Sequence, residues 1–386
     1  MMKQTECERR KMMKKLLSAF LALMLLLALV PALAEGEVAA FVATIAKHGN
    51  LELDISGEAL MAQGLEYGDV LKVTIADAAW EMPLGSNYSD VDNGMPVMRS
   101  KNDASPVVIA LNMSDFATAA QIAVKSTTEE EPGYRWDYLM EHPVQVLISL
   151  KEKAGYREQW LLHQLVRTNE RSDYAHLSDE DFANFRMVDT TGIRQGVLYR
   201  SSSPINPEIG RSAYADAAAK DAEIKTVINL ADASNTYDAI ENAYYPSCST
   251  VYLNLGVDFS SADFKAGLAK GLRFMLENEP PYLVHCNEGK DRAGFASALL
   301  ECLMGASAEE VIADYMHTYI NYYGLEKGTE KYDAVVGSNI TQTLEAAFGV
   351  EDVYTADLAR EAEAFVMEEL GLVQQEVDAL KEKLGK

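Results

Sequence analysis

Short stretches in which apolar and polar side chains alternate dominate the chain from residue 37 to about residue 150. The clearest are residues 51–55 and 70–75, and residues 107–111 and 144–148 are further apolar runs. Alternation with a period of two is typical of half-buried β-strands. The pattern therefore predicts a small antiparallel β-barrel or sandwich domain over residues 35–165.

The pattern changes beyond a polar stretch at residues 167–181. Two apolar runs, 227–230 and 251–255, alternate with segments of helical period at residues 208–220, 263–276, 292–304 and 308–322. Such alternation indicates a sheet covered by helices. We expect an α/β domain over residues 166–386, with a C-terminal helix near 355–386 that closes the domain or reaches a partner.

The first 34 residues form a separate segment. Lysines precede an apolar run at residues 16–30, and the small-x-small pattern before Ala34 is typical of a secretory signal peptide cleaved there. The run is shorter than the roughly 20 residues that span a bilayer, although a retained anchor is the alternative. We expect residues 1–34 to be a signal peptide and the mature protein to be secreted or extracytoplasmic.

The charge composition of the chain limits which classes of molecule it can bind. Lys plus Arg number 34 against 59 Asp plus Glu, so the formal net charge is −25. This acidity argues against broad electrostatic binding to nucleic acid or to anionic lipid surfaces, and an anionic substrate must be bound by local donors. The six histidines show no metal-ligand spacing and no glycine-rich nucleotide loop occurs, so we expect no metal and no cofactor.

The strongest chemical motif follows an apolar strand at residues 281–285 and precedes a helix. Cys286 has an arginine, Arg292, six residues later and Gly289 between them. A tight loop of this length can turn its amide N–H groups inward around a phosphate while the thiolate attacks phosphorus and the guanidinium binds the oxygens. Helix N-terminus and amides also favour the thiolate. The alternative is an inert buried cysteine beside a salt-bridged arginine.

The segment from His285 to Gly294, with sequence HCNEGKDRAG, resembles the signature of cysteine-dependent tyrosine and dual-specificity phosphatases, most nearly the bacterial tyrosine-phosphatase-like branch. Residues 184–186 and 196–201 resemble the two upstream motifs of that branch. The resemblance implies Cys286 as nucleophile and Arg292 as the residue that binds phosphate and stabilises the transferring group. It implies phosphate binding by the loop, with His285 supporting the thiol; the loop residues are Asn287, Glu288, Gly289, Lys290, Asp291 and Arg292.

The resemblance also implies an aspartate general acid on a loop about thirty residues before the nucleophile. Asp258 fits best, because it follows the strand that ends near residue 255. Asp263 and Asp232 are alternative candidates, and Asp258 as a simple helix cap is a further interpretation.

Two positions depart from the family pattern. Ala293 stands where a Ser or Thr hydroxyl usually contacts the cysteine sulfur and assists phosphate release, so the second step is expected to be slow. Residues 187–192 replace the usual Asp-Leu-Gly-Gly form of the first upstream motif.

The N-terminal region has a strand after Gly49-Asn50, a strand after Gly68-Asp69, a loop at residues 87–91, a strand at residues 94–97 and a late Ala-rich segment. This order resembles, with little residue identity, the carboxy-terminal β-barrel of the S-adenosylmethionine hydroxide adenosyltransferases. The nucleotide-binding partner domain of that family is absent from the sequence, so its chemistry is not expected here, and the ligand of this domain is unknown.

The sequence thus predicts an exported, two-domain phosphatase that hydrolyses phosphomonoesters through a cysteinyl-phosphate. Phosphotyrosine or another phosphoprotein, a phosphoinositide and an inositol phosphate all stay open as substrates. A phosphate-recognition module with weak or no turnover is the alternative, motivated by Ala293. A rhodanese-like sulfur transferase is a lesser one.

Overall fold

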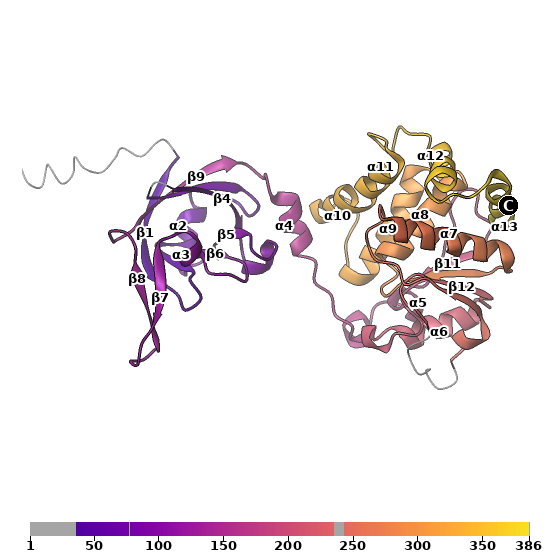
Figure 1. The fold of residues 1–386 in the computed structure, drawn as a ribbon, viewed down its shortest axis with the longest axis horizontal. Helices are drawn as coiled ribbons and strands as arrows, with labels where there is room; N and C mark the ends of the chain where they lie inside the picture. The colour runs from indigo at the N-terminus through magenta and orange to yellow at the C-terminus, as the bar shows by residue number, and fades with distance from the viewer. Residues whose placement is uncertain (1–35, 77, 235–242, 386) are drawn as a thin grey trace, which may run out of the picture. The chain divides into compact units, whose positions relative to one another are not determined.

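The structure is a computed structural model, in which residues 36–76, 78–234 and 243–385 are described. The chain divides into two compact units, Met1–His163 and Gln164–Lys386 (Figure 1). The signal peptide expected at residues 1–34 lies outside the described residues. Among the described residues, no helix combines the length and the apolar character that crossing a membrane requires.

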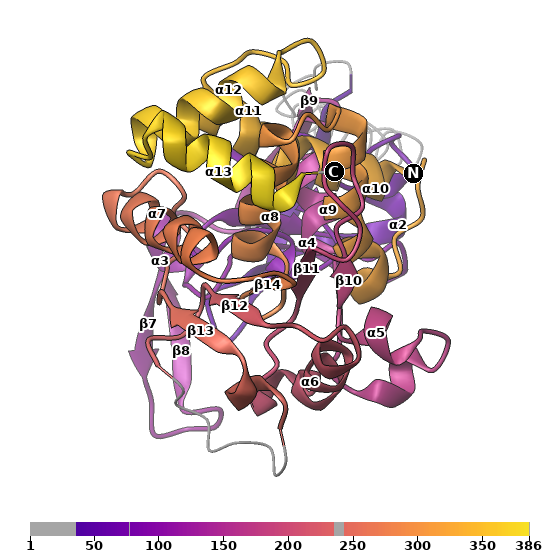
Figure 2. The same cartoon turned by 90° about the vertical axis from the view of Figure 1, so that its right-hand side faces the viewer.

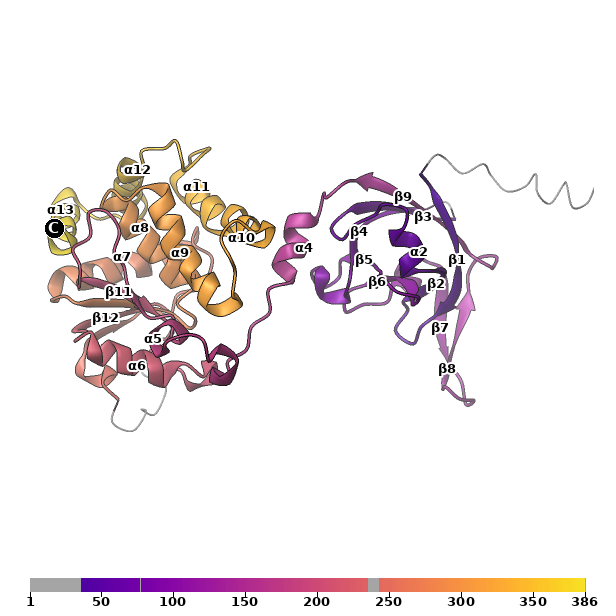
Figure 3. The same cartoon turned by 180° about the vertical axis from the view of Figure 1, so that it is seen from behind.

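The first unit is a closed β-barrel, as Figure 3 shows from behind. Its strands are β1 (Val38–Ile45), β2 (Leu51–Ser56), β3 (Val70–Ile75), β4 (Ala78–Gly85), β5 (Pro96–Arg99), β6 (Pro106–Leu111) and β9 (Gln145–Glu152). They are hydrogen-bonded in the order β1-β2-β6-β5-β4-β3-β9, with β9 also pairing with β1. The predicted β-rich domain is therefore confirmed as a barrel.

One pair of strands corrects the expectation of a wholly antiparallel barrel. Strands β4 and β5 pair in parallel, with Leu84 opposite Met98. The connection between them crosses over instead of forming a hairpin, and the buried carboxylate of Asp90 holds it by accepting hydrogen bonds from the amides of Ser86 and Asn87 at 2.6 and 3.0 Å. A sequence of alternating strands does not reveal such a crossover, because both pairings show the same period.

The barrel interior follows from the alternation. On β3, Leu71, Val73 and Ile75 are buried, and Leu51 and Leu53 on β2 join the same apolar core. The short helices α2 (Gly57–Met61) and α3 (Phe116–Ala119), the hairpin of β7 (Ala123–Thr127) and β8 (Tyr134–Tyr138), and α4 (Arg157–His163) complete this unit.

The second unit is built on a five-stranded sheet. Its strands are β10 (Arg186–Met187), β11 (Leu198–Ser201), β12 (Thr226–Asn229), β13 (Ser249–Tyr252) and β14 (Tyr282–His285), in the order β10-β11-β14-β12-β13. All neighbours pair in parallel except β10, which is antiparallel to β11. This confirms the predicted α/β domain.

Helices cover both faces of this sheet. Figures 1 and 2 show α7 (Ala262–Glu277), α8 (Asp291–Leu303) and α9 (Ala308–Tyr323) on one face, and α5 (Asp179–Phe182) and α6 (Ser212–Asp221) on the other. The remaining helices are α10 (Glu330–Val335), α11 (Gln342–Phe348), α12 (Leu358–Ala364) and α13 (Gln374–Leu384).

Two helix expectations need correction. The helix expected at residues 208–220 begins at Ser212, because Pro207–Ile209 form a separate 3-10 turn that ends at Gly210 with φ of 68°. The C-terminal region is not one helix: α12 continues into a π-helical turn at Phe365–Glu369, and Gly371, with φ of 69°, redirects the chain before α13.

Strand β14 lies at the centre of the sheet, between β11 and β12, and all four of its residues are buried. Its carboxyl end leads directly into Cys286. In open α/β sheets, ligands bind at the carboxyl ends of the strands, so the fold places the candidate loop at the usual edge for a site.

Candidate active site

The loop that carries the candidate nucleophile joins β14 to α8. Cys286 follows the strand and is 3% exposed, and Asp291 begins the helix. Gly289 has φ of 69°, and a Cβ at this position would lie 2.3 Å from the carbonyl oxygen of Ser201. Only glycine fits there without strain, so the sequence supplies the one residue that lets the loop turn tightly against β11.

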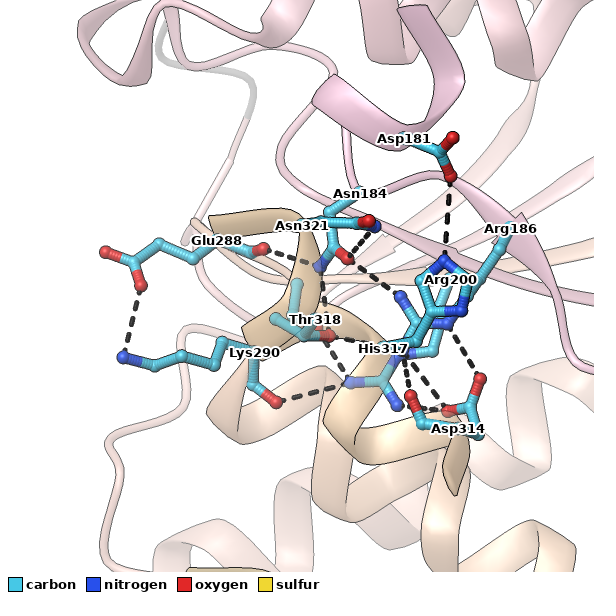
Figure 4. Close-up of polar contacts among 11 residues, drawn as sticks. Asp181, Asn184, Arg186, Arg200, Glu288, Lys290, Asp314, His317, Thr318 and Asn321 are labelled. Atoms are coloured by element: carbon cyan, nitrogen blue, oxygen red, sulfur yellow. Dashed lines mark hydrogen bonds and ion pairs between the residues drawn. The ribbon is translucent and has the colours of Figure 1, made fainter. Parts of the chain in front are cut away.

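The backbone carbonyls of residues 287–290 in this loop accept hydrogen bonds from groups outside the loop. That of Asn287 accepts from the Ser203 amide at 2.8 Å, and that of Glu288 accepts from the Tyr322 hydroxyl at 2.9 Å and from Asn184 Nδ2 at 3.1 Å. Arg200 Nη2 donates to the Gly289 carbonyl at 2.8 Å and to the Lys290 carbonyl at 3.3 Å. Figure 4 shows Asn184 and Arg200 reaching the loop from one side.

This arrangement fixes the direction of the amides. In a planar trans peptide the N–H points away from the C=O of the same peptide group, so the amides of residues 288–291 point away from the groups that hold the carbonyls. In the part of the chain that the structure describes, none of the amide N–H groups of residues 287–292 donates a hydrogen bond to another group. A row of oriented amides at a helix N-terminus is an anion-binding cradle.

Arg200, which holds two of the carbonyls, is itself fixed by a buried ion pair. Its side chain is fully buried on β11, and Nη1 lies 2.5 Å from Asp314 Oδ2 on α9. Arg186 pairs with Oδ1 of the same carboxylate at 2.7 Å (Figure 4). Burial opposes ionisation of Asp314, but the two guanidinium groups outweigh it and lower its pKa to about 2.

Arg292 lies in the first turn of α8, where its backbone continues the amide row. Its Nη1 donates to the carbonyl of Leu255 at 2.8 Å. Leu255 immediately precedes the segment that carries Asp258. The guanidinium therefore ties the start of α8 to the base of that segment.

Asp258 lies between β13 and α7, where Ser261 caps the helix. Its carboxylate accepts from the hydroxyl and the amide of Ser260 at 2.6 and 3.1 Å, and these two bonds lower its pKa. The side chain lines a cavity of about 350 Å³ together with residues of α11. Of the described residues that line this cavity, none belongs to the 286–292 loop.

Asp232, one of the alternative candidates for the general acid, is linked to β14, the strand before Cys286. Asn229 Nδ2 donates to Asp232 at 3.0 Å and to the Tyr245 hydroxyl at 3.1 Å, and that hydroxyl lies 3.1 Å from His285 Nε2. The structure thus connects Asp232 to His285 through Asn229 and Tyr245, whereas Arg292 bonds to Leu255, which lies three residues before Asp258 in the sequence. Asp263 is exposed in the first turn of α7.

His285 is fully buried at the end of β14, and its Nδ1 lies 3.2 Å from the Cys286 carbonyl. Burial lowers its pKa to about 4, so the ring is neutral at physiological pH. A neutral imidazole here holds the backbone beside the thiol without adding charge.

Charged side chains lie beside the loop as a second layer. Glu288 pairs with Arg167 through one carboxylate oxygen and with Lys290 through the other, the latter at 3.3 Å. Lys290 also lies 3.8 Å from Asp291. Within the described residues, no group of three or more His, Cys, Asp and Glu side chains could hold a metal ion.

The sequence did not single out several residues that shape the loop. These are Arg167, Asn184, Arg200, Ser203 and Tyr322, all of which contact the loop by side chain or backbone. Asn184 and Arg200 belong to the two upstream motifs, so the sequence did mark the segments in which they lie. The spacing of those motifs, however, does not show that either residue supports the loop.

Comparison with known proteins agrees with this geometry. A model of the tyrosine phosphatase family matches residues 180–386, and the chain belongs to that family. The resemblance of the HCNEGKDRAG segment to the tyrosine phosphatases is therefore confirmed at the level of the family. No curated protein sequence matches the chain.

Two solved structures show limited similarity. One is an uncharacterised conserved protein from Thermotoga maritima, at 17% identity over 31% of this chain and 38% of that chain, with a TM-score of 0.24. This chain thus spans well under half the length of that protein. The other is the core catalytic domain of the PP-IP phosphatase SIW14 from S. cerevisiae, at 17% identity over 40% of this chain and 85% of that chain, with a TM-score of 0.26.

Proposed function

We propose that this protein is an exported phosphatase that hydrolyses phosphomonoesters through a cysteinyl-phosphate on Cys286. The observation that carries the proposal is the row of backbone carbonyls after Cys286, each held from behind, which turns the amides of residues 288–291 to the opposite side. Such a cradle at the start of α8 favours a dianionic phosphoryl group.

In the first step the Cys286 thiolate attacks phosphorus, the S–P bond forms and the bond to the leaving oxygen breaks. The loop amides bind the phosphoryl oxygens. Arg292 uses one N–H on Leu255, and a guanidinium has five donors, so others serve the phosphoryl group. Asp258 gives its proton to the leaving oxygen.

In the second step water attacks phosphorus, the P–O bond forms and the S–P bond breaks, which releases phosphate and the thiolate. Asp258, now ionised, takes the proton of the attacking water. Ala293 provides no hydroxyl beside the sulfur, and it is fully buried. We therefore expect this second step to limit turnover.

Phosphorylated protein, phosphoinositide and inositol phosphate are the proposed substrate classes, and the barrel is proposed as an accessory binding or spacer module. One assay tests the function. Protein from residue 35 onward is given p-nitrophenyl phosphate, a phosphotyrosine peptide and inositol hexakisphosphate, beside Cys286→Ser. Phosphate release that the variant abolishes supports the enzyme.

The second candidate function is a phosphate-recognition module, which the missing hydroxyl at Ala293 favours. Binding of phosphate esters without any Cys286-dependent release would establish the module and overturn the enzyme. Ala293→Ser discriminates further, because a hydroxyl restored beside the sulfur is expected to raise steady-state turnover if hydrolysis of the intermediate is slow.

A further inference from the structure

Glu288 occupies an unusual position for a carboxylate, since it lies within an anion-binding loop. Its backbone belongs to the cradle, but its side chain turns aside and is 24% exposed. One carboxylate oxygen pairs with Arg167 and the other lies 3.3 Å from Lys290 Nζ (Figure 4 shows the second contact). Two cations, Lys290 of the loop and Arg167 outside it, therefore share the carboxylate of Glu288.

Both cations are positioned by further contacts. The Arg167 guanidinium lies over the ring of Tyr322, 5.3 Å from its centroid, and donates to Asn169 Oδ1 at 2.7 Å. Lys290 Nζ lies 3.5 Å from the Tyr323 hydroxyl. The side chains of Arg167 and Lys290 are 24% and 18% exposed, so ligands can reach them from solvent.

The charges of this group cancel. Arg167 and Lys290 bring two positive charges, and Glu288 and Asp291, which lies 3.8 Å from Lys290, bring two negative ones. Burial disfavours the charged form of Lys290, but Asp291 and Glu288 outweigh it and raise its pKa. The loop amides and Arg292 are thus left to bind one phosphoryl group, beside a second anion position that the chain itself fills.

We propose that Glu288 is a specificity-determining residue, which occupies the Arg167–Lys290 pair and makes the enzyme prefer esters with one phosphoryl group over substrates with a second phosphate beside it. This rests on the proposed function and narrows its substrate class. Arg167 lies outside the 180–386 segment that matches the family, so this chain's own residues upstream of it complete the arrangement.

The physical reason is competition for the same donors. A second phosphate near the reacting group must displace the Glu288 carboxylate from two charge-assisted contacts, and it then lies close to two carboxylates that repel it. A single phosphoryl group seated on the amides avoids both costs. Removal of the Glu288 charge therefore frees two cations for a second phosphate.

The test compares the wild type with Glu288→Gln on a phosphotyrosine peptide and on inositol hexakisphosphate. The wild type is expected to prefer the peptide, and the variant to shift the ratio of kcat/KM toward the hexakisphosphate by about tenfold. Arg167→Gln added to Glu288→Gln should reverse most of that shift. Glu382→Gln, an exposed carboxylate on α13, gives the same charge change and should leave the ratio unaltered.

A binding measurement separates this inference from the proposed function. The binding measurement uses Cys286→Ser protein, so it does not depend on turnover. In that background, Glu288→Gln should tighten the binding of inositol hexakisphosphate about tenfold more than the binding of inorganic phosphate. An unchanged binding ratio, or a wild-type preference for the hexakisphosphate that Glu288→Gln weakens, overturns the specificity role. Absence of Cys286-dependent turnover on every substrate overturns only the proposed function.

Discussion

Arg200 Nη2 donates to the carbonyl oxygen of Gly289 at 2.8 Å, across 89 residues of sequence. The side chain is fully buried between this loop and Asp314, and its other terminal nitrogen, Nη1, pairs with the Asp314 carboxylate. Figure 4 shows the carbonyl of Lys290 meeting the same guanidinium. One buried cation therefore sets the direction of two consecutive peptide groups in the loop that follows Cys286.

Arg200→Lys should impair catalysis more than folding. Lysine keeps the charge for Asp314 but lacks the planar fork that reaches two carbonyls, so the amides of residues 290 and 291 lose their fixed direction. We expect kcat/KM for p-nitrophenyl phosphate to fall about 10²-fold and the inhibition constant of inorganic phosphate to rise. Arg360→Lys, at an exposed arginine, is the control. Wild-type kinetics in Arg200→Lys would show that catalysis does not require the two Arg200 hydrogen bonds to the loop carbonyls.

Gly289→Ala should destabilise the protein and abolish activity. The position has φ of 69°, and the added Cβ meets the Ser201 carbonyl at 2.3 Å. Gly349→Ala is a matched control, because that glycine has φ of 65° and no atom within 4 Å of the new Cβ. Chemical denaturation should give a loss of about 1 kcal/mol in the control and a larger loss in Gly289→Ala. Equal losses and retained activity in both would argue against the tight loop.

Asp258→Asn should lower kcat by about 10² to 10⁴ while phosphate binding persists. Because the Ser260 hydroxyl and amide lower the pKa of Asp258, Ser260→Ala should raise that pKa. A general acid must be protonated to act, so the alkaline limb of the kcat/KM profile should then move to higher pH. Near-normal turnover in Asp258→Asn moves the role to another aspartate, and Asp232→Asn and Asp263→Asn identify which one.

Glu301 on α8 predicts a pH dependence of stability. Burial and then Asp314 raise its pKa well above the usual value, against the opposing effect of Arg200 and Arg186. The unfolded chain therefore loses this proton first as pH rises, and the Glu301 contribution to the free energy of unfolding falls above the ordinary carboxyl range. Glu301→Gln removes this loss of stability with rising pH. The unfolding free energy of the variant, relative to that of the wild type, should therefore increase between about pH 4 and 7. A difference that stays constant over this range contradicts a protonated Glu301.

The local sequence predicted the loop itself far better than it predicted the residues that hold the carbonyls of the loop. The spacing from Cys286 to Arg292, Gly289 and the flanking strand and helix are all contained in about a dozen residues, and the fold places them as expected at the end of β14. Asn184 lies 104 residues from the Glu288 carbonyl that it holds. Such contacts depend on how the loop packs against β11, α9 and the segment between α5 and β10, which no local pattern encodes.

The identity of the general acid is undetermined by sequence for a related reason. Asp232 and Asp258 both follow strands of the parallel sheet, so topology brings both to the edge where Cys286 lies. Spacing alone favours Asp258. The two aspartates differ in their hydrogen bonds in the structure. Asp232 is connected through Asn229 and Tyr245 to His285, whereas Asp258 accepts from Ser260.

The most direct measurement is to trap the covalent intermediate. Wild-type protein from residue 35 onward is mixed with p-nitrophenyl phosphate, quenched in acid within milliseconds and digested for mass spectrometry. The account predicts one added phosphoryl group on the peptide that contains Cys286, at a level that Cys286→Ser abolishes together with turnover. Steady release of p-nitrophenol by Cys286→Ser, or a phosphoryl group found on a different residue, would contradict it.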